Sequence, residues 1–203
     1  AEQETGIITD KQSKNFITME ELNTFIQKMK KDIKDKPQLH MVYVMFEILS
    51  RHPLRNDLAG MIYLTQKAYS KLTDVQKVER NYLVKTEGGF ILLDADHKTA
   101  KTHGTIKIHI DKDTELAKVL RTYLRVMKYK GGMDIFPITP NYMSQLLIKY
   151  SDKYISKNIS STMIRKIVSS EKFLGAKEEQ IEHAKQLGHS VQTENLIYIK
   201  KKQ

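Results

Sequence analysis

At 203 residues the chain is long enough for one domain with a substantial buried core. Lysine and arginine exceed aspartate and glutamate by 34 to 24, and the net charge of +10 favours a polyanionic partner, first nucleic acid and second an anionic membrane surface. The sequence contains no cysteine, which excludes disulfide bonds and a thiolate nucleophile, and no apolar run in it is long enough to span a membrane.

Residues 1–17 are mostly polar and show no apolar periodicity, so we expect a flexible arm or linker ahead of a domain that spans residues 18–203. The pattern Thr18-Met19-Glu20-Glu21 is typical of a helix N-terminus. The amphipathic helix that it begins is expected to end near Asp35, before a proline.

A densely apolar segment follows between His40 and Arg51. Its apolar residues are not confined to one stripe, which predicts a helix buried on most sides. Pro53 interrupts this helix, and the run from Leu54 to Gly60 is expected to start a further short helix.

The apolar period then changes from that of helices to that of strands. Tyr82-Leu83-Val84 and Phe90-Ile91-Leu92-Leu93 flank Glu87-Gly88-Gly89, which predicts a β-hairpin. A third strand is expected from Thr105 to Ile110, because isoleucines alternate there with polar residues. The polar segment 94–104, which carries two lysines, forms the turn between the second and third strands.

The remainder of the chain is predicted to be helical. One apolar stripe runs from Leu116 to Met127, a helix opened by Pro140 covers Tyr142 to Tyr154, and three further helices are expected toward the C-terminus. The predicted fold class is therefore α+β: a mostly helical domain with a small three-stranded antiparallel sheet at one edge.

Three motifs near the C-terminus carry the functional signal. They are Ser160-Ser161-Thr162-Met163-Ile164-Arg165, then Leu187-Gly188-His189-Ser190, and then Tyr198. Their order resembles the C-terminal half of the active site of tyrosine recombinases, the phage-integrase-like enzymes, in which His-x-x-Arg precedes Leu-Gly-His-Ser and a nucleophilic tyrosine. Thr162 stands where that family usually has the first histidine.

The resemblance extends upstream to the family's first arginine and its lysine. Arg55, with Asp57, fits the position of that arginine between two buried helices. Lys101-Thr102-His103-Gly104 is similar to the family's Lys-Thr-Gly turn between the second and third strands, and Lys98-Thr99-Ala100 is a rival for the same role. Together these motifs look most like the integrases of virophages and large DNA viruses.

The resemblance implies strand cleavage through a 3′-phosphotyrosine on Tyr198, with no metal, ATP or other cofactor. Arg55 and Arg165 would hold the non-bridging phosphate oxygens in bidentate geometry. Lys101 would protonate the departing 5′ oxygen, and His189 would hydrogen-bond the phosphate or assist the tyrosine proton. Supporting roles would fall to Thr162, Asp57 and Lys98, and contacts with DNA to Lys98, Lys101, Arg165 and Lys166.

The implied partner is double-stranded DNA, with no membrane association. The family carries a separate N-terminal core-binding domain that is not in this sequence, so we expect the chain to be a piece of a longer protein. The full-length protein is expected to form a homotetramer on DNA, and this piece a monomer. If it is viral, it would act inside the cell, in the host nucleus or a viral factory.

Other interpretations of the same residues stay open. A type IB topoisomerase would share the fold and mechanism, but its Ser-Lys-x-x-Tyr run is absent, since Glu194-Asn195-Leu196-Ile197 precede Tyr198. A DNA-binding module without catalysis is the third hypothesis, because a threonine hydroxyl cannot act as a base near neutral pH. A zinc site on the hairpin finds no support in the ligand spacing, which involves His97, His103, His109, Asp94 and Asp96.

Overall fold

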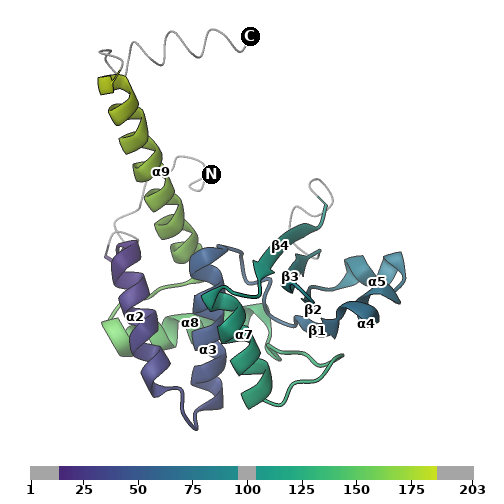
Figure 1. Ribbon diagram of the computed structural model, residues 1–203. Helices are drawn as coiled ribbons and strands as arrows, with labels where there is room; N and C mark the ends of the chain where they lie inside the picture. Colours follow the sequence, from purple (N-terminus) through teal and green to yellow (C-terminus); the bar gives the residue numbers. More distant parts are fainter. Residues whose placement is uncertain (1–13, 96–103, 187–203) are drawn as a thin grey trace.

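A computed structural model describes residues 14–95 and 104–186, with side chains described as far as residue 176. Most of the helices lie on one side of a small sheet and the short α4 and α5 lie on the other, so the predicted mixed α+β class is confirmed (Figure 1). The helices are α2 (Met19–Asp32), α3 (Pro37–Arg51), α4 (Gln66–Ser70), α5 (Asp74–Glu79), α7 (Glu115–Val126), α8 (Pro140–Ile155) and α9 (Ser161–Gln186).

Helix α3 is the centre of the core. Every residue from Leu39 to Ser50 is buried, and α3 contacts α2, α7, α8 and α9. The predicted helix buried on most sides is therefore confirmed. The expected helix start at Thr18 is confirmed too, because the Thr18 hydroxyl accepts a hydrogen bond from the Glu21 N–H (3.1 Å). Ile17, within the expected arm, is buried in the same core.

The sheet has one strand more than the sequence predicts. The hairpin of β2 (Tyr82–Thr86) and β3 (Gly89–Asp94) and the third strand, β4 (Ile106–Asp111), pair antiparallel as expected. A fourth strand, β1 (Ile62–Thr65), pairs parallel with β2, giving the order β1-β2-β3-β4. The predicted three-stranded antiparallel sheet is therefore present, and β1 extends it by one parallel strand that the sequence did not predict. A four-residue apolar run cannot be told from a helix segment by its period, and its partner lies across the α4–α5 crossover.

Gly89 shows why the hairpin turn needs a glycine. Its φ of +137° lies outside the range that other residues readily adopt. A Cβ added there would lie 2.1 Å from the Ile110 carbonyl oxygen of the neighbouring strand. The turn therefore requires glycine at this position, both for its backbone conformation and for the close approach of the neighbouring strand.

The segment from Leu54 to Gly60 is not helical, so the short helix expected there is wrong. Tertiary contacts hold it as a loop instead. Gly60, with φ +74°, donates its N–H to the Phe136 carbonyl (2.9 Å), and Leu58 is fully buried. These contacts outweigh the weak local preference for helix.

Helix α9 runs without interruption for 26 residues and leaves the body of the domain, as Figure 1 shows. Where three helices were expected beyond Tyr154, the described residues contain this single one, and residues 187–203 lie outside them. Phe173 and Leu174, on the protruding part, are 69% and 55% exposed. None of the helices in the described part of the chain is long and apolar enough to cross a membrane.

The buried histidine His40, on α3, makes stability sensitive to acid. Its ring lies 5.2 Å from the Tyr123 ring, centroid to centroid. Burial lowers the pKa of His40 below the ordinary value of 6.5, so the folded protein keeps the ring neutral while the unfolded chain protonates it. The free energy of unfolding should therefore be fully retained above about pH 6.5 and fall below it, by at most about 1.4 kcal/mol per pH unit for this residue.

Urea unfolding between about pH 7.5 and 5.5 tests this expectation. His40→Met should reduce the acid-side slope without removing it, because burial, then Arg51, then Lys172 also lower the pKa of His52. His109→Gln, which replaces an exposed histidine, is the matched control. An equal slope in the His40→Met variant and the wild type would contradict the assignment.

Candidate active site

The predicted site residues fall into two groups in the structure. Arg55 and Asp57 lie on the loop between α3 and β1, and Thr162, Arg165 and Lys166 lie on the first two turns of α9. The remaining predicted residues, Lys98, Lys101, His189 and Tyr198, lie outside the described residues. The first question is therefore whether the fold brings the two described groups together.

Asn56 joins these two groups directly. The Ser161 hydroxyl, at the start of α9, donates to Asn56 Oδ1 (2.7 Å), and Asn56 Nδ2 donates to Ser144 Oγ on α8 (2.7 Å). Ser161 is buried and Asn56 is half-buried, so water competes little for these bonds. The loop that carries Arg55 is thereby fixed to the helix that carries Arg165.

A second asparagine joins this loop to the β3–β4 turn. Asn81 Nδ2 donates to the Asp57 carbonyl (2.9 Å), and Asn81 Oδ1 accepts from the Ala95 N–H (2.8 Å). Ala95 directly follows β3, at the base of the turn in which Lys98 and Lys101 fall. The end of β3 is thus held at the loop that carries Arg55 and Asp57, while Lys98 and Lys101 lie outside the described residues.

The beginning of α9 is held from its other side as well. The Ile159 N–H donates to Ser151 Oγ on α8 (2.9 Å), and the Met163 N–H donates to Ser160 Oγ (3.3 Å). Ile159 and Ile164 are fully buried. Since the helix start is fixed by packing and by hydrogen bonds, the positions of Thr162 and Arg165 follow from it.

Arg55 and Arg165 lie on the two segments that the Asn56–Ser161 hydrogen bond joins. Arg55 is exposed and adjoins Asn56, whereas Arg165 is half-buried and lies four residues after Ser161, on the same face of α9. Within residues 14–95 and 104–176, neither guanidinium forms an ion pair or a side-chain hydrogen bond; the pairs found there are Lys30–Glu115, Arg51–Glu47, Lys77–Asp74 and Lys118–Glu115. Both can therefore bind an external oxyanion.

Two cationic side chains act on His52, at the end of α3. The pKa of His52, at the end of α3, is lowered by burial first and then by the charges of Arg51 and Lys172. The Lys172 charge therefore reaches His52, which places this part of α9 beside the end of α3.

Sequence reasoning placed Arg55 and Arg165 in the site but missed the residues that hold them. The bond between Ser161 and Asn56 joins residues 105 positions apart, and the bond between Ala95 and Asn81 joins residues 14 positions apart. No local spacing relates such positions, and asparagine and serine are common loop residues. Within the described residues no three His, Asp or Glu side chains gather as metal ligands would, while His97, His103 and Asp96 lie outside those residues.

Comparison of the chain with protein-family models, curated proteins and solved structures gives no match. The functional argument for this chain therefore rests on its own motifs and on the geometry just described.

Replacing Asn56 by alanine tests the role of the loop contacts. The change leaves Ser161 and Ser144 without their shared partner, which is expected to destabilise the fold by about 1–3 kcal/mol. Because Arg55 also loses its fixed position, the DNA cleavage that the motifs predict should fall by more than the stability loss explains. Urea unfolding gives the first quantity, and strand cleavage measured well below the melting temperature gives the second.

Gln38→Ala is the matched control for Asn56→Ala. Gln38 also forms two side-chain hydrogen bonds between α3 and α8, accepting from the Tyr150 hydroxyl (2.9 Å) and donating to Tyr142 (3.3 Å), but it lies at the other end of α3. Its loss should affect stability alone. Equal cleavage by the two variants would show that Asn56 is merely structural.

Proposed function

We propose that this chain is the catalytic domain of a site-specific DNA recombinase or integrase of the tyrosine recombinase type. It would cleave and rejoin DNA strands through a 3′-phosphotyrosine intermediate, without metal or ATP. The observation that carries the proposal is the pair of asparagine contacts, Asn56 with Ser161 and Asn81 with Asp57 and Ala95. These bonds support a common site for the two arginines and the lysine-bearing turn.

The two described arginines would act on the phosphate itself. Strand cleavage places additional negative charge on the non-bridging oxygens as the tyrosine oxygen attacks phosphorus. Planar guanidinium groups from Arg55 and Arg165 would bind those oxygens in bidentate geometry and stabilise the transition state. Thr162, exposed one residue after Ser161, would donate a hydrogen bond to the same phosphate but would not transfer its proton.

Residues outside the described part of the chain would carry the covalent step. The Tyr198 oxygen would form the bond to phosphorus as the bond to the 5′ oxygen breaks, and Lys101 would give its proton to that leaving oxygen. His189 would hydrogen-bond the phosphate or accept the tyrosine proton. The energy of the broken bond is kept in the phosphotyrosine ester, so a free 5′ hydroxyl can reverse the reaction and join a strand.

Thr162 also gives a reason to consider a DNA-binding module without catalysis. The hydroxyl replaces the imidazole that the resemblance leads one to expect, and this removes one group that could move a proton near neutral pH. Binding through Arg55, Arg165 and the basic surface would survive that loss. The two functions differ in whether a covalent bond to DNA forms.

A nicked suicide duplex separates the two functions. The fragment downstream of the cleavage site is made short enough to diffuse away, so that a covalent protein–DNA complex accumulates. A shifted band that resists denaturing electrophoresis supports the recombinase proposal, whereas binding without such a band over a panel of sequences supports the binding module. Joining of a second duplex supports recombination, and relaxation of supercoiled plasmid alone would favour a topoisomerase.

A further inference from the structure

A second basic site lies away from Arg55 and Arg165, in a groove of about 530 Å³ between α7 and the sheet. Lys118, Arg121 and Arg125 come from α7 and Lys85 from β2, and none of the described residues that line the groove is a carboxylate. We propose that this groove binds the phosphate backbone of duplex DNA, as a second contact outside the cleavage site. The inference rests on DNA being the substrate proposed above.

The three cationic residues of α7 lie on one side of the helix. Lys118, Arg121 and Arg125 are spaced three and four residues apart, so they form a single stripe on the helix and extend about 10 Å along it. Successive phosphates of one B-DNA strand lie about 3.4 Å apart along the helix axis. The stripe can therefore follow a short run of phosphates.

The groove floor strengthens these charges. Phe90 and Leu124 are buried beneath the cationic side chains, and Tyr63 and Tyr129 complete the lining. An apolar floor lowers the local dielectric constant, so each lysine or arginine attracts an anion more strongly there than on an open surface. The Arg121 guanidinium also donates to the Lys112 carbonyl (2.9 Å), which fixes its direction.

The α7 charges have little internal compensation. Among the described residues, Lys118 contacts Glu115 at 3.8 Å, and both side chains are more than half exposed, so this pair contributes little. Arg121 and Arg125 form no ion pair in the same part of the chain, and like charges four residues apart destabilise a helix slightly. An external polyanion would remove that repulsion.

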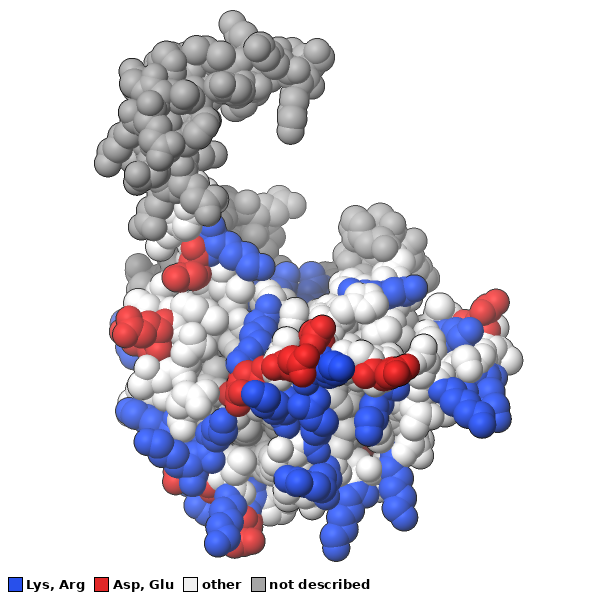
Figure 2. Space-filling model, in the orientation of Figure 1, with Lys and Arg blue, Asp and Glu red and all other residues white. Residues whose placement is uncertain are grey.

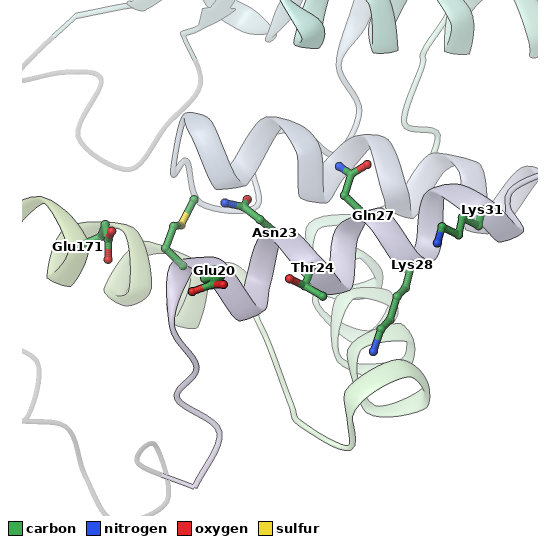
Figure 3. Close-up of a pocket in the computed structure, with 8 residues that line it drawn as sticks. Glu20, Asn23, Thr24, Gln27, Lys28, Lys31 and Glu171 are labelled. Atoms are coloured by element: carbon green, nitrogen blue, oxygen red, sulfur yellow. The ribbon is translucent and has the colours of Figure 1, made fainter.

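Another groove, within the described part of the chain, lacks this character. It lies along α2, with Glu20 and Glu171 toward one end and Lys28 and Lys31 toward the other, as Figure 3 shows. Its charges balance, whereas those of the α7 groove are all positive. Lys and Arg side chains also predominate over the lower part of the face in Figure 2. The α7 groove is therefore the better anion site of the two.

The test compares two triple variants of the full chain that each lose three positive charges. The groove variant is Lys118→Gln/Arg121→Gln/Arg125→Gln, and the control is Lys28→Gln/Lys31→Gln/Lys34→Gln on and after α2. Affinity for a fluorescent duplex is measured at several salt concentrations. The slope of log affinity against log salt should fall by about 2–3 for the groove variant and by less than about 1 for the control.

Three outcomes would overturn the groove proposal. Equal changes of slope in both variants would show a general charge effect. A groove variant that binds DNA normally but no longer binds inorganic tripolyphosphate would show a site for small anions. The Arg121→Lys/Arg125→Lys variant keeps Lys85 and the positive charges of the stripe. If its slope differs from that of the wild type while its circular dichroism spectrum is unchanged, phosphate attraction is not the role of the stripe.

The recombinase proposal can fail separately. The groove variant should still form the covalent complex with the suicide duplex at saturating DNA, because it retains Arg55 and Arg165. A wild-type protein that shows the predicted salt slopes but no covalent complex would leave the groove proposal standing and remove the recombinase proposal.

Discussion

Tyr198→Phe is expected to abolish covalent attachment to DNA while leaving the fold and the affinity for duplex DNA unchanged. Phenylalanine keeps the ring and its packing but lacks the oxygen that would form the bond to phosphorus. Covalent complex with a suicide duplex should therefore fall below detection. Far-ultraviolet circular dichroism and a DNA titration on the same preparation check the fold and the binding.

Tyr150→Phe and Tyr154→Phe are the controls for this loss. Both tyrosines lie on α8, where the Tyr150 hydroxyl donates to Gln38 (2.9 Å) and the Tyr154 hydroxyl donates to Asp32 (2.7 Å). Burial raises the pKa of Tyr150, and burial, followed by Asp32, raises that of Tyr154 to about 12, so neither is a ready nucleophile. Loss of the adduct in either control, or its persistence in Tyr198→Phe, would show that the nucleophile is misassigned.

Lys101→Ala is expected to slow strand cleavage by about 10²–10⁴, the effect typical of a lost general acid. The informative substrate carries sulfur in place of the bridging 5′ oxygen, because a thiolate leaves without needing a proton. With this substrate the Lys101 variant should cleave nearly as fast as the wild type. Single-turnover rates on both substrates provide the comparison.

Arg55→Ala and Arg165→Ala distinguish the acid from the phosphate ligands. Their loss removes stabilisation of the non-bridging oxygens, worth about 10²–10³ in rate for one group, and sulfur in the leaving position should not restore it. If the sulfur substrate restores cleavage by Lys98→Ala, and Lys101→Ala cleaves normally, the general acid is Lys98. If neither lysine variant is rescued, the general acid does not lie in this turn.

The elements that the sequence predicted correctly are those with strong local signals. The hairpin of β2 and β3 needs a turn glycine between two apolar runs, and Gly88-Gly89 marks it unambiguously. Thr18 starts α2 because its hydroxyl satisfies a free backbone N–H, which depends on neighbouring residues alone. The dense apolar run of α3 required burial wherever the remaining helices were placed.

The features that were missed depend on distant contacts. Strand β1 exists because Ile62 to Thr65 pairs with Tyr82 to Lys85, and the segment from Leu54 to Gly60 is a loop because Phe136 and Asn81 bind it. Likewise the motifs suggested that Arg55 and Arg165 share a site, but the means of bringing them together is Asn56. Such pairings carry no local period, so a single sequence cannot reveal them.

The central claim is that Tyr198 becomes linked to a DNA 3′ phosphate, and peptide mapping of the covalent complex tests it most directly. The complex formed on a suicide duplex is digested with nuclease and protease and analysed by mass spectrometry. The account predicts one modified peptide, with the nucleotide phosphate on Tyr198. A nucleotide on any other residue, or an intact Tyr198 peptide in a protein that has cleaved its substrate, would contradict the account.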